Sequence, residues 1–132
     1  MSEQGVEFVE GIYGAFARGD VPAVLGAFAE DIEWYEAEGM PYGGLHNGPE
    51  AIAQKVFGPI TEDIDGFALV IEEFIGSGAT VAAVVRYTGT GKATGKALDV
   101  PAVHVWDIRD GKVTRFRQFM DTVKYAEVVP AT

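Results

Sequence analysis

The chain has 132 residues, of which 48% are hydrophobic and 23% charged, so it predicts a single globular domain over residues 1–132 with a sizeable core. Its formal net charge of -10 argues against binding to nucleic acid or to anionic membranes and favours a neutral or cationic small molecule as ligand. The chain has no cysteine, no signal-peptide pattern and no apolar run of about 20 residues, which excludes disulfides and thiolate chemistry and predicts a soluble, cytoplasmic protein.

The first part of the chain predicts two helices. Apolar residues at helical spacing over residues 3–18 predict an amphipathic first helix. Gly19 suits its end, and Asp20 can cap a second helix in which the early Pro22 loses no needed donor. The buried stripe of the second helix is expected to comprise Val24, Leu25 and Phe28.

A strand, a loop and a third helix are predicted next. Residues 31–36 alternate as a short strand does, which would carry Glu36 onto the inner face with Trp34. Residues 37–48 are rich in Gly, Pro and Asn and predict a loop long enough to be functional. A third helix is expected to follow and to end near the Gly-Pro step at 58–59.

The second half of the chain predicts four strands joined by turns. They cover residues 67–75, 79–90, 97–108 and 112–121. Helices gathered on one side of a largely antiparallel sheet make the predicted fold class α+β. Residues 80–87 are apolar on both faces apart from the end of the run, so we expect a second copy of the chain to cover the outer sheet face, giving a homodimer.

The last two strands are predicted to form a β-hairpin, because Asp110 and Gly111 separate two runs of β-forming residues. Along the first strand a period of two places His104 in an otherwise apolar row. The same period places Gln118 in one row of the second strand. The two polar side chains are therefore expected on one surface of the sheet.

Four pieces of sequence carry a resemblance: ARGD at 17–20, FAEDIEWYE at 28–36, LHNGPEAI at 45–52 and WDIRDGKVTRFRQFMDT at 106–122. On these pieces the chain resembles the ketosteroid-isomerase-like, SnoaL-like branch of the nuclear-transport-factor-2-like superfamily. The resemblance implies a cone-shaped, curved, mostly antiparallel sheet and three main helices that enclose an apolar pocket, and in many members a homodimer. The superfamily hosts isomerases, cyclases, epoxide hydrolases, dehydratases and proteins that only bind, so fold alone does not choose the reaction.

The steroid isomerases give one matching position. Their general-base aspartate corresponds to Glu36. Their oxyanion pair is not reproduced, since its tyrosine falls nearest Ile12, beside Tyr13, and its acid falls on or beside His104.

Two other branches of the superfamily match less well. The acting histidine and aspartate of the polyketide cyclases correspond to His104 and Gln118, and the second of these is not an acid. The Asp-Arg-Asp set of limonene-type epoxide hydrolases falls on Tyr87, Val85 and Gln118, so that reaction is not expected.

Glu36 and His104 are the catalytic candidates. Burial beside Trp34 would raise the pKa of Glu36 toward neutrality, as a general acid or base requires, whereas the alternative is a solvated strand end. For His104 the alternative to a pocket role is a satisfied core histidine. The candidate binding residues, whose aromatic members are also simple core residues, are Tyr13, Trp34, Tyr87, Phe116 and Gln118.

No metal or cofactor is expected. His46 lies far in sequence from His104, and the two lack a metal-binding spacing. The Gly-rich run at 88–96 joins two strands and predicts a turn rather than a phosphate loop.

Two hypotheses of function follow. The first is a cofactor-independent isomerase, cyclase or lyase that acts on a small hydrophobic molecule by proton transfer between Glu36 and His104. The second is a non-catalytic ligand-binding or dimerisation module. The missing acid at Gln118 favours the second, and a carboxylate within reach of a ligand would favour the first.

Overall fold

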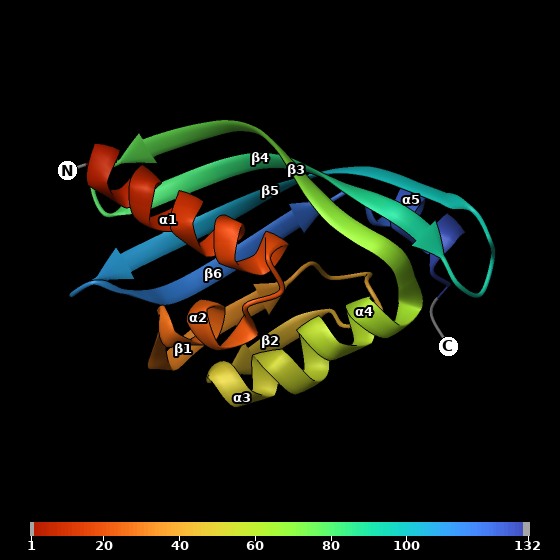
Figure 1. Cartoon of the computed structure of the whole chain (residues 1–132), viewed down its shortest axis with the longest axis horizontal. Coiled ribbons are helices and arrows are strands. Elements are labelled where there is room, and N and C mark those ends of the chain that lie inside the picture. The colour runs from red at the N-terminus through yellow and green to blue at the C-terminus, as the bar shows by residue number, and fades with distance from the viewer. Residues whose placement is uncertain (1, 131–132) are drawn as a thin grey trace.

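A computed structural model describes residues 2–130 as a curved six-stranded sheet with helices packed against one face (Figure 1). In chain order the elements are α1 (Ser2–Ala17), α2 (Val21–Gly26), β1 (Phe28–Glu36), β2 (Gly44–Asn47), α3 (Pro49–Ile52), the π-helical turn η1 (Ala53–Phe57), α4 (Gly58–Asp63), β3 (Ile64–Ser77), β4 (Thr80–Gly91), β5 (Ala97–Arg109), β6 (Lys112–Met120) and α5 (Thr122–Val128). The strand order is β2-β1-β6-β5-β4-β3, and of the described pairs β1–β6 alone is parallel. The predicted α+β class with a mostly antiparallel sheet is confirmed.

The β5–β6 hairpin has the predicted turn. Asp110 and Gly111 both have positive φ, 51° and 73°, as a two-residue turn of type I′ requires. The buried row of β5 contains His104, and the register pairs His104 directly with the buried Gln118 on β6. The two polar side chains therefore share the inner surface of the sheet, as expected.

The first two helices lie together over the sheet (Figure 1). Asp20 caps α2 with its side chain, as predicted, but α2 ends at Gly26. Phe28, expected in the buried stripe of α2, is instead the first residue of β1. Gly5 allows α1 to approach β4, because a Cβ at this position would lie 3.1 Å from Val81 Cγ2. No helix among residues 2–130 is long and apolar enough to cross a membrane.

Residues 37–48 are more ordered than the predicted loop. Their last part forms β2, which pairs antiparallel with β1. The side chains of Met40 and Tyr42, just before β2, are buried in the core. The prediction of a loop was wrong here because a strand of four residues at the sheet edge is too short to show an alternating pattern.

The third helix does not end at Gly58 and Pro59, as predicted, but continues to Asp63. The π-helical turn precedes the proline, and the Gly58 N–H donates to the Ala53 carbonyl. Because Pro59 has no N–H, a local widening of the helix lets the chain continue where an α-helix would be broken. The continued helix leads directly into β3, which begins at Ile64, earlier than predicted.

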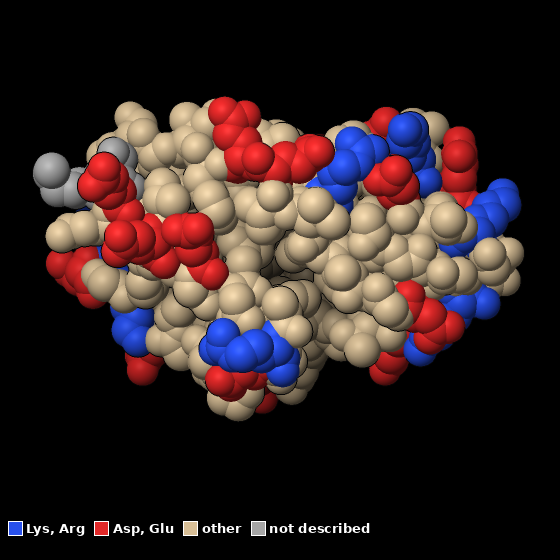
Figure 2. Space-filling model, turned by 45° about the horizontal axis from the view of Figure 1, so that its top comes forward, with Lys and Arg blue, Asp and Glu red and all other residues tan. Residues whose placement is uncertain are grey.

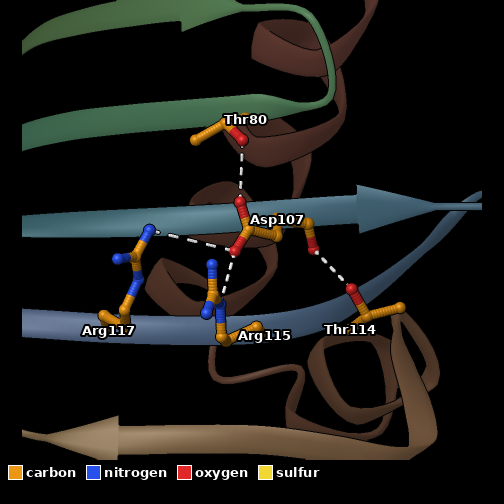
Figure 3. Close-up of polar contacts among 5 residues, drawn as sticks. All are labelled: Thr80, Asp107, Thr114, Arg115 and Arg117. Atoms are coloured by element: carbon orange, nitrogen blue, oxygen red, sulfur yellow. Dashed lines mark hydrogen bonds and ion pairs between the residues drawn. The ribbon is translucent and has the colours of Figure 1, made fainter.

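The outer face of the sheet carries a cluster of charged side chains around Asp107 on β5 (Figure 3). The Asp107 carboxylate accepts hydrogen bonds from Thr80 Oγ1 on β4 and from Arg115 Nε on β6, both at 2.7 Å. Arg117 Nη2 lies 3.9 Å from the same carboxylate. Burial alone would raise the pKa of Asp107, but these contacts lower it. The cluster links the three strands β4, β5 and β6.

Candidate functional site

A small cavity of about 40 Å³ lies between the inner face of the sheet and the helices. This volume has room for about one or two water molecules. Six of the predicted site residues line it: Tyr13, Trp34, Glu36, Tyr87, His104 and Phe116. Gln118, the remaining one, donates a hydrogen bond to the Tyr87 hydroxyl. The fold thus brings together residues from α1, β1, β4, β5 and β6.

His104 is held between two tyrosine hydroxyls. Its Nδ1 lies 2.6 Å from Tyr13 Oη, and its Nε2 lies 2.7 Å from Tyr87 Oη. The side chain is only 3% exposed, and burial lowers its pKa to about 3. At neutral pH His104 is therefore an uncharged imidazole, with one ring nitrogen donating and the other accepting.

One tyrosine hydroxyl hydrogen beside His104 takes no part in the hydrogen bonds to the imidazole. Trp106 Nε1 donates to the Tyr13 hydroxyl at 3.0 Å, and Gln118 Nε2 donates to the Tyr87 hydroxyl. The two contacts between tyrosine and imidazole use two hydrogens, whereas the imidazole and the two hydroxyls together supply three. The Tyr13 hydrogen is free if Nδ1 carries the ring proton, and the Tyr87 hydrogen is free if Nε2 carries it. In either tautomer one phenol at the cavity wall is able to donate to a ligand.

Glu36 is a buried carboxyl with one unpaired oxygen. It ends β1, where the alternation that buries Trp34 also turns Glu36 inward. Trp34 Nε1 donates to Oε1 at 2.8 Å, while Oε2 has no hydrogen-bond partner among the described residues. Burial raises the pKa of Glu36 to about 7, and the Trp34 hydrogen bond and the Gln118 amide oppose this rise only in part. Glu36 therefore exchanges protons near neutral pH.

Gln118 connects the two halves of the site. Its Oε1 accepts a hydrogen bond from the Ala37 backbone N–H at 3.1 Å, which fixes the amide so that Nε2 points to Tyr87. The same contact holds the backbone next to Glu36. Because an amide does not titrate, Gln118 orients its neighbours and does not move a proton.

Trp106 and a second tyrosine cluster were missed by the sequence analysis. The Tyr42 hydroxyl donates to Asp63 Oδ2 at 2.8 Å and lies 3.0 Å from the Tyr125 hydroxyl. Trp106 shares the inner row of β5 with His104, so the period of two could have assigned it to the site. Tyr42 and Tyr125 show no such signal, because they come from a loop and from α5, far apart in sequence.

The two catalytic candidates line the cavity from different strands. Glu36 comes from β1 and His104 from β5, and neither a hydrogen bond nor an ion pair joins them within the described residues. The site therefore combines a carboxyl that titrates near neutrality with a phenol hydrogen free to donate. This pair of groups can move a proton and stabilise negative charge that develops on a nearby oxygen.

Glu36 and His104 act on stability with opposite dependence on pH. The pKa of Glu36 is raised from 4.5 to about 7. Its contribution to the free energy of unfolding is therefore fully present below pH 4.5 and is lost as pH rises through 7. The pKa of His104 is lowered from 6.5 to about 3. Its contribution to the free energy of unfolding is therefore fully present above pH 6.5 and is lost as pH falls through 3. Between pH 4.5 and 6.5 the two effects cancel.

We predict that Glu36→Gln exposes the effect of His104. Relative to wild type, its free energy of unfolding should fall by about 1.4 kcal/mol per pH unit as pH falls from 6.5 to 4.5. Urea denaturation at a series of pH values measures this, and Glu33→Gln on the exposed side of β1 is the matched control. Parallel profiles for wild type and Glu36→Gln would contradict the raised pKa of Glu36.

Comparisons with known proteins agree with this architecture. The family model for the SnoaL-like domain matches residues 9–116. An NTF2-like protein from Burkholderia thailandensis is 34% identical, with a TM-score of 0.90 over 95% of this chain and 96% of that chain. An NTF2-like protein of unknown function from Burkholderia pseudomallei is 30% identical, with a TM-score of 0.89 over 99% and 100% of the two chains. TerC, co-crystallised with polyporic acid, is 28% identical, with a TM-score of 0.86 over 96% and 98%. No curated protein matches the sequence significantly. The chain belongs to the SnoaL-like domain family.

Proposed function

We propose that this protein binds a small, mainly apolar molecule in the cavity and catalyses a proton transfer on it without a cofactor, as an isomerase, cyclase or lyase. The observation that carries the proposal is the buried side chain of Glu36, which lines an apolar cavity and whose Oε2 has no hydrogen-bond partner among the described residues. Leaving a buried polar atom unsatisfied destabilises a fold by about 1–3 kcal/mol. Such groups gather at functional sites, where their raised pKa suits acid-base chemistry.

In the proposed reaction the ionised Glu36 removes a proton from a carbon beside a ligand carbonyl. The C–H bond breaks, an O–H bond forms on Glu36, and the electron pair moves to the carbonyl oxygen as an enolate. The free hydroxyl hydrogen of Tyr13 or Tyr87 donates to that oxygen in a site that excludes water. Return of the proton to a different carbon completes an isomerisation, and departure of a leaving group instead completes a lyase reaction.

This proposal gives His104 a positioning role instead of a share in the proton transfer. With a pKa of about 3 and both ring nitrogens occupied, His104 gains no proton at neutral pH. It fixes the two tyrosine hydroxyls relative to each other. Gln118 supports the same arrangement from β6.

The cavity must widen to admit a ligand, since small-molecule sites usually measure about 300–1,000 Å³. Its wall includes the partly buried rings of Phe16, Phe57 and Phe67, which meet edge to face. The proposal requires these rings to rotate away from the cavity when a ligand enters. The co-crystallisation of TerC with polyporic acid supports a small organic ligand for this chain too.

Non-catalytic ligand binding is the second candidate function. The feature that favours it is Gln118, an amide fixed between Ala37 and Tyr87 where polyketide cyclases place an acid. Without a second titrating group at that position, the cavity can hold a ligand by shape and hydrogen bonds alone.

We also propose that a second copy of the chain covers the outer face of the sheet. Large apolar side chains are exposed on four of its strands: Tyr35, Leu45, Val70, Ile75 and Phe119. Arg117 Nε on the same face is buried without a hydrogen-bond partner. Exposed apolar side chains of this kind are typical of an interface between identical subunits.

The dimer is tested by size-exclusion chromatography with light scattering at tens of micromolar. We expect twice the mass of the chain for wild type. Phe119→Glu should shift the protein to monomer, because it replaces an exposed apolar side chain of the proposed interface with a charge, whereas Val123→Glu, at an exposed position of α5, should remain a dimer. A strictly monomeric wild-type protein would defeat the proposal.

Proton transfer is tested by deuterium exchange at the α-carbon of an enolisable ketone such as 2-tetralone, followed by proton NMR in D₂O. We expect wild type to accelerate exchange over buffer and Glu36→Gln to lower the accelerated rate by at least about 100-fold. Tyr13→Phe and Tyr87→Phe each remove one candidate donor, so the larger loss identifies the one that contacts the ligand oxygen.

Glu33→Gln serves as the control in the exchange assay, because Glu33 is exposed on the same strand as Glu36. It should exchange the ketone as wild type does. If the ketone shifts the indole NMR signals of Trp34 and Trp106 but exchange stays at the buffer rate, the catalytic proposal fails and the binding function is left.

A further inference from the structure

A groove lies on the surface between α1 and β3. Its volume is about 670 Å³, within the range of about 300–1,000 Å³ for small-molecule sites. Three carboxylates line it, Glu10 from α1 and Glu72 and Glu73 from β3. Figure 2 shows a hollow near the middle of this face, with acidic side chains above it and to its left and basic side chains below it and to its upper right. We call this feature the acidic groove.

The acidic groove adjoins the cavity of the candidate site. The side chains that line both spaces are Tyr13, Phe16, Phe67 and Leu69. The rings of Phe16 and Phe67 meet edge to face with their centroids 6.1 Å apart, and both are only partly buried. The groove and the cavity therefore lie on two sides of the same side chains, and a ligand that reaches from one into the other requires the phenylalanine rings to move apart.

A β-bulge places the two glutamates of β3 at the groove. Glu72 is the extra residue in the register between Ile71 and Glu73. The bulge shifts the alternation, so Glu72 and Glu73 are both exposed while Phe74 turns inward against Tyr13, with ring centroids 6.0 Å apart. Bulges re-aim side chains in this way and are frequent beside functional sites.

The charge of the acidic groove is not neutralised by the protein. None of its three carboxylates forms an ion pair within residues 2–130. Arg18 and Arg86 lie nearby. Arg18 Nη1 is 3.4 Å from the Cβ position of residue 14, and Arg86, which pairs with Asp99 at 2.7 Å, also interacts electrostatically with Glu72. The groove therefore keeps a net negative charge.

Gly14 keeps the α1 side of the groove open. It lies one helical turn after Glu10 and lines the same groove. Glycine inside a helix destabilises it by about 0.5–1 kcal/mol relative to alanine. Close packing does not require glycine here, unlike at Gly5, because a Cβ would contact only the flexible end of Arg18. A larger side chain at this position would narrow the groove.

We propose that the acidic groove binds the positively charged end of an organic amine, whose apolar body reaches between Phe16 and Phe67 into the cavity. Aromatic faces combined with carboxylates recognise ammonium groups, and the same carboxylates repel anions. The far end of the ligand meets Glu36, which lines the cavity and whose Oε2 has no hydrogen-bond partner among the described residues. The inference rests on the proposed use of the cavity as a ligand site and adds the class of ligand.

The test compares three probes with the same aromatic body: phenethylamine, 2-phenylethanol and 3-phenylpropanoate, which are cationic, neutral and anionic at pH 7. Binding is followed through the indole NMR signals of Trp34 and Trp106, which line the cavity. We expect phenethylamine to bind at least about tenfold more tightly than 3-phenylpropanoate at low ionic strength, with 2-phenylethanol between them.

Two sets of variants assign the preference to the groove. The triple variant Glu10→Gln, Glu72→Gln, Glu73→Gln should remove the preference for the amine. Its control, Glu30→Gln, Glu62→Gln, Glu127→Gln, changes the net charge equally at exposed sites elsewhere and should keep the preference.

A second pair of variants tests the shape of the groove. Gly14→Leu should weaken binding of phenethylamine at least about tenfold by filling the groove. Gly11→Leu should bind as wild type does, because Gly11 is exposed on the same helix with no atom near its Cβ position. Both substitutions raise helix propensity, so loss of folding does not explain a difference between them.

The proposal is overturned if the amine does not bind at millimolar concentration, if it binds no better than 3-phenylpropanoate, or if both triple variants lose the preference equally. These outcomes are independent of the exchange assay, since none of the groove variants changes Glu36 or a hydrogen bond to His104. If the amine binds but the ketone does not exchange, the proposed reaction is wrong and the proposal that the acidic groove binds an amine stands.

Discussion

Withdrawal of polar side chains from water is the constraint on which the rest of this structure depends. Glu36, His104 and Gln118 are the buried polar residues in the part of the chain that the structure describes, and their hydrogen-bond partners come from the sheet, from α1 and from the backbone just after β1. The neutral His104 satisfies both ring nitrogens with phenols. One oxygen of Glu36 accepts a hydrogen bond, and the other has no partner among the described residues. Burial then moves the two pKa values in opposite directions, because it disfavours whichever form carries charge.

Strand pairing brings these buried polar residues together in one site. The antiparallel register of β5 and β6 sets His104 opposite Gln118, and the parallel pairing of β1 with β6 brings the end of β1 beside the same amide. The site therefore combines the polar side chains of Glu36 and His104 with a wall that is mainly aromatic and aliphatic. Toward the solvent it meets a rim of carboxylates, a distribution of charge that suits a ligand with an apolar body and a cationic end.

Periodicity in the sequence predicted the strands, the hairpin turn and the inner row that contains His104. A strand that is buried on one face has apolar side chains at every second residue, and this alternation is visible in the sequence. It also placed Glu36 inward with Trp34. It could not show that Tyr13, from α1, contacts His104, since that contact depends on how a helix crosses the sheet. Nor could composition reveal β2 or the helix that continues through Pro59, because an edge strand of four residues and a π-helical turn leave no periodic signal.

The most direct test of this account is the pKa of the Glu36 carboxyl group. Carbon-13 NMR of protein labelled at the glutamate side-chain carboxyl carbon, with the Glu36 signal assigned by its absence in Glu36→Gln, follows this group alone through a pH titration. The account predicts a midpoint near 7. A midpoint near 4.5, the ordinary value for a glutamate in water, would show that Glu36 is solvated and would contradict the buried acid-base site.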